Sequence, residues 1–152
     1  MTPQQLFRTA AFAEAVTWTL LIGALILRAV TGFAPAVTIA GGIHVFVFLS
    51  YGATAVLLAV NQRWHPGVAA TAIASAIVPY ATIPVELWLA RSGRLDGQWR
   101  REETDDPRDK TWVDRTMRWF LHRPIVLIAL IAVAVVVLFV VLLSAGPPKL
   151  PS

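Results

Sequence analysis

Long stretches without charged side chains are the feature that most limits how this chain can fold. From Ala29 to Gln62, and again from Pro124 to Pro148, the sequence contains no Asp, Glu, Lys or Arg. Two further stretches, 9–27 and 64–90, contain a single carboxylate each. The hydrocarbon core of a bilayer is roughly 30 Å thick and needs about 20 apolar helical residues to cross it. All four stretches have a length that matches this requirement.

These stretches predict transmembrane helices, because a segment in hydrocarbon has to satisfy its own backbone N–H and C=O groups. The composition agrees: 57% of the residues are hydrophobic and 14% are charged, whereas soluble domains are about one quarter charged. We therefore predict an all-α, polytopic membrane protein with four transmembrane helices. The expected spans are 6–30, 36–61, 67–92 and 122–145.

The stretch from Arg91 to Arg123 is different, because it contains nine Lys or Arg and seven Asp or Glu. Its middle part, 100–109, predicts a mobile polar loop. After Pro107, aromatic and basic residues alternate in a way that favours a short amphipathic helix at the membrane interface. Its interfacial side chains would be Trp112, Trp119, Arg115 and Arg118. The alternative is that the fourth transmembrane helix begins early and is kinked at Pro124.

This pattern divides the chain into four parts. We expect a three-helix membrane domain at 1–93, a charged loop and amphipathic segment at 94–121, the fourth transmembrane helix at 122–145 and a tail at 146–152. A cleaved signal peptide at the start is the weaker interpretation. The first apolar stretch exceeds the roughly 7–15 residues of such signals and contains Glu14.

Basic residues predict the orientation, because Lys and Arg favour the cytoplasmic side of a membrane protein and acidic residues count for little. With four crossings, the nine basic residues of 91–123 lie on the same face as Arg28, whereas Arg8, Arg63 and Lys149 lie on the other. We therefore expect a multi-pass protein of the cell inner (plasma) membrane. Its loop 94–121 would be cytoplasmic and both termini would be outside.

Three ionisable side chains lie inside the predicted spans: Glu14, His44 and Glu86. Such groups are costly in hydrocarbon unless they face protein or water, so they indicate a functional site by default. A helix rises about 1.5 Å per residue, which puts Glu14 and His44 within roughly 6 Å of each other in height. We predict one intramembrane polar cluster that draws counter-charge from Arg8 and Arg28. The simpler interpretation stays open: a hydrogen-bonded packing role for His44 and an interfacial role for Glu86.

Nothing in the sequence points to catalysis. Cysteine is absent, the three histidines lie in different segments, and phosphate-loop, dinucleotide, zinc-protease and nucleophile-elbow motifs are missing. We therefore expect no enzyme activity, no catalytic residue, no metal site and no cofactor. The net charge of +4 sits beside apolar segments, which favours lipid headgroups over nucleic acid as its partner.

Three sequence patterns carry a resemblance to a known family. Phe7, Arg8, Ala11 and Glu14 match F-R-x-x-A-x-x-E, Gly41 and His44 match a glycine shortly before a histidine, and Ser75, Pro79, Tyr80 and Thr82 match S-x-x-x-P-[FY]-G-T with Ala81 in place of the glycine. Over residues 5–92 the chain resembles a family of small bacterial integral membrane proteins of unknown function. The charged loop and the fourth span lie outside this resemblance, which implies three membrane spans but no activity.

Two functional hypotheses follow. The first is a non-catalytic accessory subunit that packs against a larger membrane complex, such as a respiratory or transport assembly. The second is a small carrier or sensor that binds a proton, a cation or a lipid headgroup through Glu14, His44 and Glu86. Besides the lipid bilayer, the expected partners are other membrane subunits or a homo-oligomer, and no nucleic acid.

Overall fold

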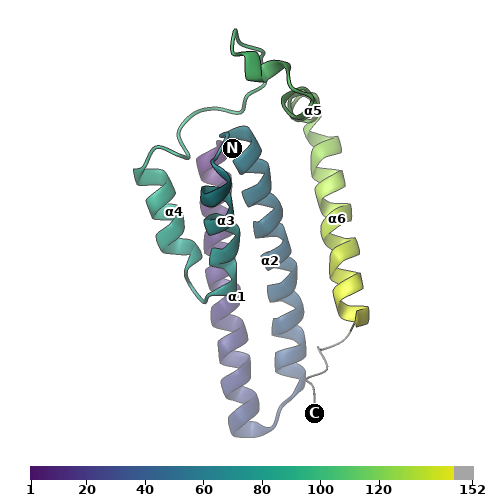
Figure 1. The fold of residues 1–152 in the computed structure, drawn as a ribbon. Helices are drawn as coiled ribbons and strands as arrows, with labels where there is room; N and C mark the ends of the chain where they lie inside the picture. The colour runs from purple at the N-terminus through teal and green to yellow at the C-terminus, as the bar shows by residue number, and fades with distance from the viewer. Residues whose placement is uncertain (146–152) are drawn as a thin grey trace.

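The architecture is a bundle of helices that run roughly along one axis, with one further helix across its end (Figure 1). A computed structural model describes residues 1–145 of the 152-residue chain. Within that range all regular structure is helical: α1 (Pro3–Thr31), α2 (Pro35–Asn61), α3 (Pro66–Ala74), α4 (Thr82–Arg91), α5 (Trp112–Leu121) and α6 (Pro124–Ala145), with 3-10 turns η1 (Ser75–Ile77) and η2 (Pro107–Lys110). The predicted tail 146–152 lies outside the described residues.

α1 and α2 form a long antiparallel hairpin, and local sequence signals explain both ends of α1. At its start, the Thr2 hydroxyl accepts from the Gln5 N–H at 3.1 Å and the Gln5 side chain accepts from the Thr2 N–H at 2.9 Å. This capping box satisfies two donors that have no partner inside the helix. At its end, Gly32 adopts a left-handed φ of 75°, which glycine does without a steric penalty. α1, α2 and α6 are each long and apolar enough to cross a membrane.

The third predicted span, 67–92, does not form one helix. α3 passes into η1, the chain turns, and α4 runs back toward the end where α3 began (Figure 1). Pro79 explains the break, because a residue before proline avoids the helical region, and Val78 is extended with φ −102° and ψ 126°. Tyr80 then has a left-handed φ of 65°, whereas Pro84 sits in the first turn of α4, where its missing N–H does no harm. We call this segment the re-entrant hairpin, because it returns to the end of the bundle where it began.

This turn-back brings the polar loop to the end of the molecule where α1 starts and α2 ends, which we call the loop end. There the Trp99 indole N–H donates to the Met1 carbonyl at 3.0 Å, and the Arg100 guanidinium donates to the Val60 carbonyl at 2.6 Å. The argument from four crossings placed the start of the chain opposite the polar loop. The structure differs because the third segment turns back on itself instead of forming one long helix. Lys149, which entered that argument, lies outside the described residues.

α5 and α6 are two separate helices rather than one helix that begins early. α5 ends at Leu121 and α6 begins at Pro124. In Figure 1 α5 is seen end-on while the long helices run along the page, so α5 lies across the loop end, as an interfacial helix does. α6 runs back along α2, where Phe139 meets Phe46 edge-on with ring centroids 6.3 Å apart. Most described α6 side chains are exposed, which agrees with a helix that faces lipid.

The packed core lies between α1, α2, α3 and α4. Its largest fully buried members include Phe7, Tyr51, Leu58 and Leu89. The Phe7 ring lies 5.4 Å from Tyr51 and 5.8 Å from Trp64 between centroids, and such aromatic pairs add to the energy of burial. The core covers the inner side of the re-entrant hairpin and leaves the turn of that hairpin exposed.

Candidate functional site

Glu14 of α1 and His44 of α2 meet between the two long helices. Glu14 has no exposed surface, His44 is 7% exposed, and the distance from Glu14 Oε2 to His44 Nδ1 is 3.9 Å. The Thr17 hydroxyl, about one turn after Glu14, donates to the Glu14 carbonyl and lies 3.0 Å from His44 Nδ1. The structure thus brings these two predicted residues together, and one hydroxyl group connects them.

Aromatic side chains close this pair off from its surroundings. The Trp18 ring lies 4.4 Å from the His44 ring between centroids, and Phe48 lies 6.4 Å from it. Trp18 also donates its indole N–H to the Ala76 carbonyl in η1 at 3.3 Å. The break in the third segment therefore supplies a carbonyl acceptor next to the pair, as broken membrane helices do.

Arg8 and Glu86 form a second ionisable pair, between α1 and α4. The Arg8 Nε–H donates to Glu86 Oε1 at 2.9 Å, and Glu86 is 2% exposed while the Arg8 side chain is about half exposed. One turn before Glu86, the Thr82 hydroxyl donates to the Ala11 carbonyl at 3.1 Å. These two bonds join α4 to α1, and Arg8 neutralises a carboxylate that would otherwise be buried alone.

The predicted residues form two pairs rather than one cluster. Arg8 and Glu14 are six residues apart on α1, which is about 9 Å along the helix. Arg28 belongs to neither pair, because it is exposed in the last turn of α1, about 21 Å along the helix from Glu14. The expected counter-charge thus comes to Glu86 from Arg8, and Arg28 lies too far along α1 to supply any to Glu14.

Sequence reasoning missed Tyr51, which is fully buried in the core. Its hydroxyl donates to the Ala72 carbonyl at 2.9 Å and lies 3.0 Å from the Ser75 hydroxyl. Ser75 also donates to the same carbonyl at 2.7 Å. A tyrosine in the middle of an apolar helix, opposite a proline-interrupted segment, was the available signal, because a buried Tyr hydroxyl needs a partner.

A network of charges holds the polar loop, which the sequence predicted to be mobile. Arg63, in the turn after α2, donates to Asp106 at 2.6 Å and also bonds Asp109. Arg100 pairs with Asp114 at 2.7 Å. Asp109 is 3% exposed, so the network is partly shielded from water. The loop is therefore tied to the end of α2.

The same contacts set the charge state of two acids in this network. Hydrogen bonds from Arg108 hold the pKa of Asp106 well below its usual range. Thr104 donates to Asp109 through its hydroxyl and its backbone N–H, and these bonds lower the pKa of Asp109. Both carboxylates are therefore charged over the whole physiological range of pH.

The four predicted interfacial residues of α5 do not behave alike. Trp112, Arg115 and Trp119 are exposed, and Trp119 carries the Arg123 guanidinium 4.5 Å above its ring. Arg118 instead turns inward, where it donates to the Asp109 carbonyl at 2.6 Å. Three side chains thus remain available to headgroups, and the fourth anchors α5 to the charged network.

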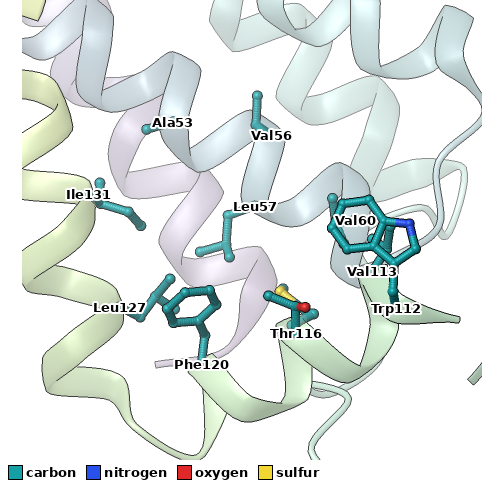
Figure 2. Close-up of a pocket in the computed structure, with 11 residues that line it drawn as sticks. Ala53, Val56, Leu57, Val60, Trp112, Val113, Thr116, Phe120, Leu127 and Ile131 are labelled. Carbon is teal, nitrogen blue, oxygen red and sulfur yellow. The ribbon is translucent and has the colours of Figure 1, made fainter. Parts of the chain in front are cut away.

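An apolar groove of about 400 Å³ opens where α2, α5 and α6 meet (Figure 2). Figure 2 shows its walls, which are Val56, Leu57 and Val60 from α2, Trp112 and Phe120 from α5, and Leu127 and Ile131 from α6. Its lining offers almost no hydrogen-bonding group, so it suits a lipid chain or an apolar side chain. In residues 1–145, no three His, Asp or Glu side chains lie close enough together to hold a metal ion.

Comparison with known protein families identifies the family of this chain. The family described as a domain of unknown function, DUF3817, matches residues 4–91, more than half of the sequence. The chain belongs to the DUF3817 family. The DUF3817 match covers α1, α2, the re-entrant hairpin and both ionisable pairs, and it leaves out the polar loop, α5 and α6. It is nearly the range over which the sequence patterns gave a resemblance.

One relative of this DUF3817 chain adds a membrane context. A protein of Streptomyces coelicolor named "Putative membrane protein SCO5905" is 33% identical to it over 91 residues. The matched part is 59% of this chain and 11% of the relative, so the chain spans about one tenth of the relative's length. No solved structure matches the chain. Together with the three long apolar helices, the relative identifies a membrane protein with transmembrane helices.

Proposed function

We propose that the protein is a non-catalytic accessory subunit, covered along its re-entrant hairpin by a larger membrane partner or by a second copy of itself. The observation that carries this proposal is the exposed stretch from the end of η1 to α4, where Ile77, Val78 and Tyr80 are 67%, 56% and 44% exposed. The Tyr80 hydroxyl lies 3.2 Å from that of Thr19. Thr19 is about 24 Å along α1 from its start, which puts the turn deep in the bundle.

Irregular backbone at that depth needs a cover. Unsatisfied N–H and C=O groups cost several kcal/mol each in hydrocarbon, and re-entrant segments persist where protein or water surrounds them. The core supplies such a cover on the inner side of the hairpin only. A neighbouring membrane helix on the outer side would supply the rest.

Two further features support an accessory role. An apolar side chain of a partner could bind in the groove between α2, α5 and α6, at the level of the interfacial helix. A unit similar to this DUF3817 domain makes up about one tenth of SCO5905, so the relative joins such a unit to a far larger chain. Both features suit a module that works beside another body of protein, such as a respiratory or transport assembly.

We infer an orientation in which the loop end is cytoplasmic. The loop end carries Arg8, Arg63 and the nine basic residues of 91–123, eleven in all, whereas the opposite end of the described residues carries Arg28. This asymmetry is stronger than the ten against three that four crossings imply, and basic residues favour the cytoplasmic side. The protein would then be a multi-pass protein of the inner (plasma) membrane, with the start of α1 and the polar loop inside.

The test is recovery from native membranes in a mild detergent, followed by determination of the mass of the particle. We expect a complex larger than one chain. A Val78→Trp substitution at the exposed turn should release the partner, whereas Val133→Trp, at a similarly exposed valine of α6, should leave the complex intact. Recovery of the unaltered chain as a lone monomer would remove the proposal.

The second hypothesis, a small carrier or sensor, has one specific observation in its favour. Both carboxylate oxygens of Glu14 are buried and have no hydrogen-bond partner among the described residues. A protein that needed Glu14 only for packing would have no use for a carboxylate there.

A further inference from the structure

Glu14 is the least satisfied polar group of the bundle. It has no exposed surface, and neither carboxylate oxygen receives a hydrogen bond from residues 1–145. Moving an isolated carboxylate into an apolar environment is so costly that such groups give up their charge or acquire a partner. Glu86 solves the same problem with Arg8 at 2.9 Å. Glu14 has no cation at that distance, so its charge has to be neutralised in another way.

The neighbouring hydroxyl cannot do this. Thr17 has one hydroxyl hydrogen and gives it to the Glu14 main-chain carbonyl. With Thr17 so oriented, His44 Nδ1, 3.0 Å from the Thr17 oxygen, donates its own hydrogen to that oxygen; in the other tautomer Nδ1 carries no hydrogen and accepts from Thr17. In either tautomer Nδ1 has no hydrogen available for Glu14 Oε2, which is 3.9 Å away. The hydrogen-bond count leaves Glu14 without a donor.

The surrounding elements offer no substitute charge. On α1 the next ionisable group is Arg8, which is engaged by Glu86 of α4. On α2 the Tyr51 hydroxyl is committed to the Ala72 carbonyl. α3 and η1 contain no ionisable side chain. His44 is therefore the ionisable partner that faces Glu14 most closely.

We propose that Glu14 and His44 form a binding site for one exchangeable proton. Binding adds the proton to a Glu14 carboxylate oxygen and converts the carboxylate to a neutral acid, and release returns the proton to water. Both oxygens lack accessible surface, so a hydrated cation or a lipid headgroup has no room to reach them. The site goes beyond the accessory role and does not depend on it.

The site couples its charge to the packing of α1 against α2. When Glu14 is a neutral acid, its side chain places no charge between α1 and α2. When the proton leaves for water, a negative charge remains on Glu14, 3.9 Å from a neutral His44, and the interface has to rearrange to give that carboxylate a donor. Two arrangements of one interface thus follow from one proton, which is what a pH sensor requires.

Infrared difference spectroscopy of the full chain in lipid vesicles tests the site. At neutral pH we expect the C=O stretch of a carboxylic acid without hydrogen bonds, and this band should shift in D2O. Raising the pH in steps should bleach the band with the loss of one carboxylic acid per chain. Glu14→Gln should remove the band, whereas Glu102→Gln, at an exposed loop glutamate, should leave it unchanged.

Three results would overturn the proposal: no such band at neutral pH, a band that survives Glu14→Gln, or a band that no pH change bleaches. His44→Asn should move the pH at which the band bleaches, and an unmoved bleaching pH would remove His44 from the site. If Glu14→Gln fails to fold, Glu14→Asp should shift the band instead of deleting it. The D2O shift of the unaltered chain needs no variant at all.

Discussion

Two buried glutamates in one bundle meet the same physical problem in different ways. Glu86 is paired with Arg8, whose long side chain reaches it from a half-exposed position. Glu14 has no cation and lies beside a histidine that already serves a hydroxyl. The first arrangement holds two helices together, and the second leaves a group whose charge can change.

This difference predicts unequal costs when the first pair is broken. Arg8→Gln leaves Glu86 buried without its cation, and we expect a loss of roughly 3 kcal/mol in the free energy of unfolding, at the low end for buried pairs because Arg8 is half exposed. Glu86→Gln should cost about 1 kcal/mol, because the freed Arg8 can extend to the headgroups. Thermal unfolding in detergent measures both. Equal losses would contradict the assignment of Arg8 as the counter-charge of a buried Glu86 carboxylate.

Tyr51 gives a second prediction at this scale. Tyr51→Phe removes the donor to the Ala72 carbonyl, but Ser75 still donates to that oxygen, so we expect a loss of about 1 kcal/mol. The matched control is Tyr80→Phe, whose hydroxyl is exposed, and its effect should stay within about 0.5 kcal/mol. A Tyr51→Phe variant that cost no more than this control would show that Tyr51 acts by shape alone.

The sequence was informative at the residue scale wherever charge is rare. Glu14, His44, Glu86 and Arg8 stand out in apolar surroundings, and simple depth arithmetic paired the first two. Arg28 was grouped with them because it lies at the adjacent helix end. Its distance from Glu14 along α1 was left out of that prediction. Tyr51 was missed because its partner is a carbonyl group, which every residue has.

At the scale of elements, the broken third segment is the instructive case. Pro79 and Pro84 were visible in the sequence, but hydropathy over 67–92 is continuous and predicts one helix. A proline inside an apolar run can kink a membrane helix or end it, and neighbouring contacts decide which. Here the Tyr80 φ of 65° completes a reversal that no periodicity encodes.

That backbone angle leads to a test. Tyr80→Gly should be tolerated or should stabilise the protein by about 1 kcal/mol, because glycine adopts a left-handed φ without the penalty of other residues. Ala81→Gly should instead destabilise by up to about 1 kcal/mol, because Ala81 has an ordinary φ of −66° and glycine adds backbone freedom. The free energies of unfolding of both variants, measured in parallel, test this expectation. The reverse order would mean that Ala81 is the strained position.

The polar loop gives an element-scale prediction in pH. The pKa values of Asp106 and Asp109 are lowered in the folded loop, so their contribution to the stability of the folded loop is full above the ordinary Asp pKa of about 3.9. It is lost as the pH falls through the lower folded values. A spin label at residue 102 should therefore become mobile in strong acid, and Arg63→Gln should loosen it already at neutral pH. A label at residue 31, at the other end of α1, is the control and should not respond.

At the scale of the whole molecule, one reversed segment changes the side on which every later residue lies. Composition and run length predicted a helical membrane protein, and three of its long helices were placed within a few residues. The relation between the chain start and the polar loop was not predictable from hydropathy, because it depends on whether 67–92 crosses. Contacts such as Trp99 with the Met1 carbonyl carry that information, and they join residues far apart in the sequence.

Labelling of single cysteines tests this arrangement cleanly, because the chain has no cysteine of its own. Thr2→Cys and Thr104→Cys should react with a membrane-impermeant maleimide from the same side, and Thr31→Cys should react from the other. Labelling of positions 2 and 104 from opposite sides would instead restore four crossings and would remove the re-entrant hairpin.

A polypeptide that passes through a bilayer an odd number of times delivers its two flanks to different compartments. With α3 and α4 folding back, residues 1–145 contain three helices long enough to traverse, namely α1, α2 and α6. Any protein joined ahead of α1 would then lie in the same aqueous compartment as residues 94–121. A protein joined beyond α6 would lie in the compartment on the other side of the membrane. A reporter enzyme that works in only one compartment should consequently be active on one flank of this chain and silent on the other.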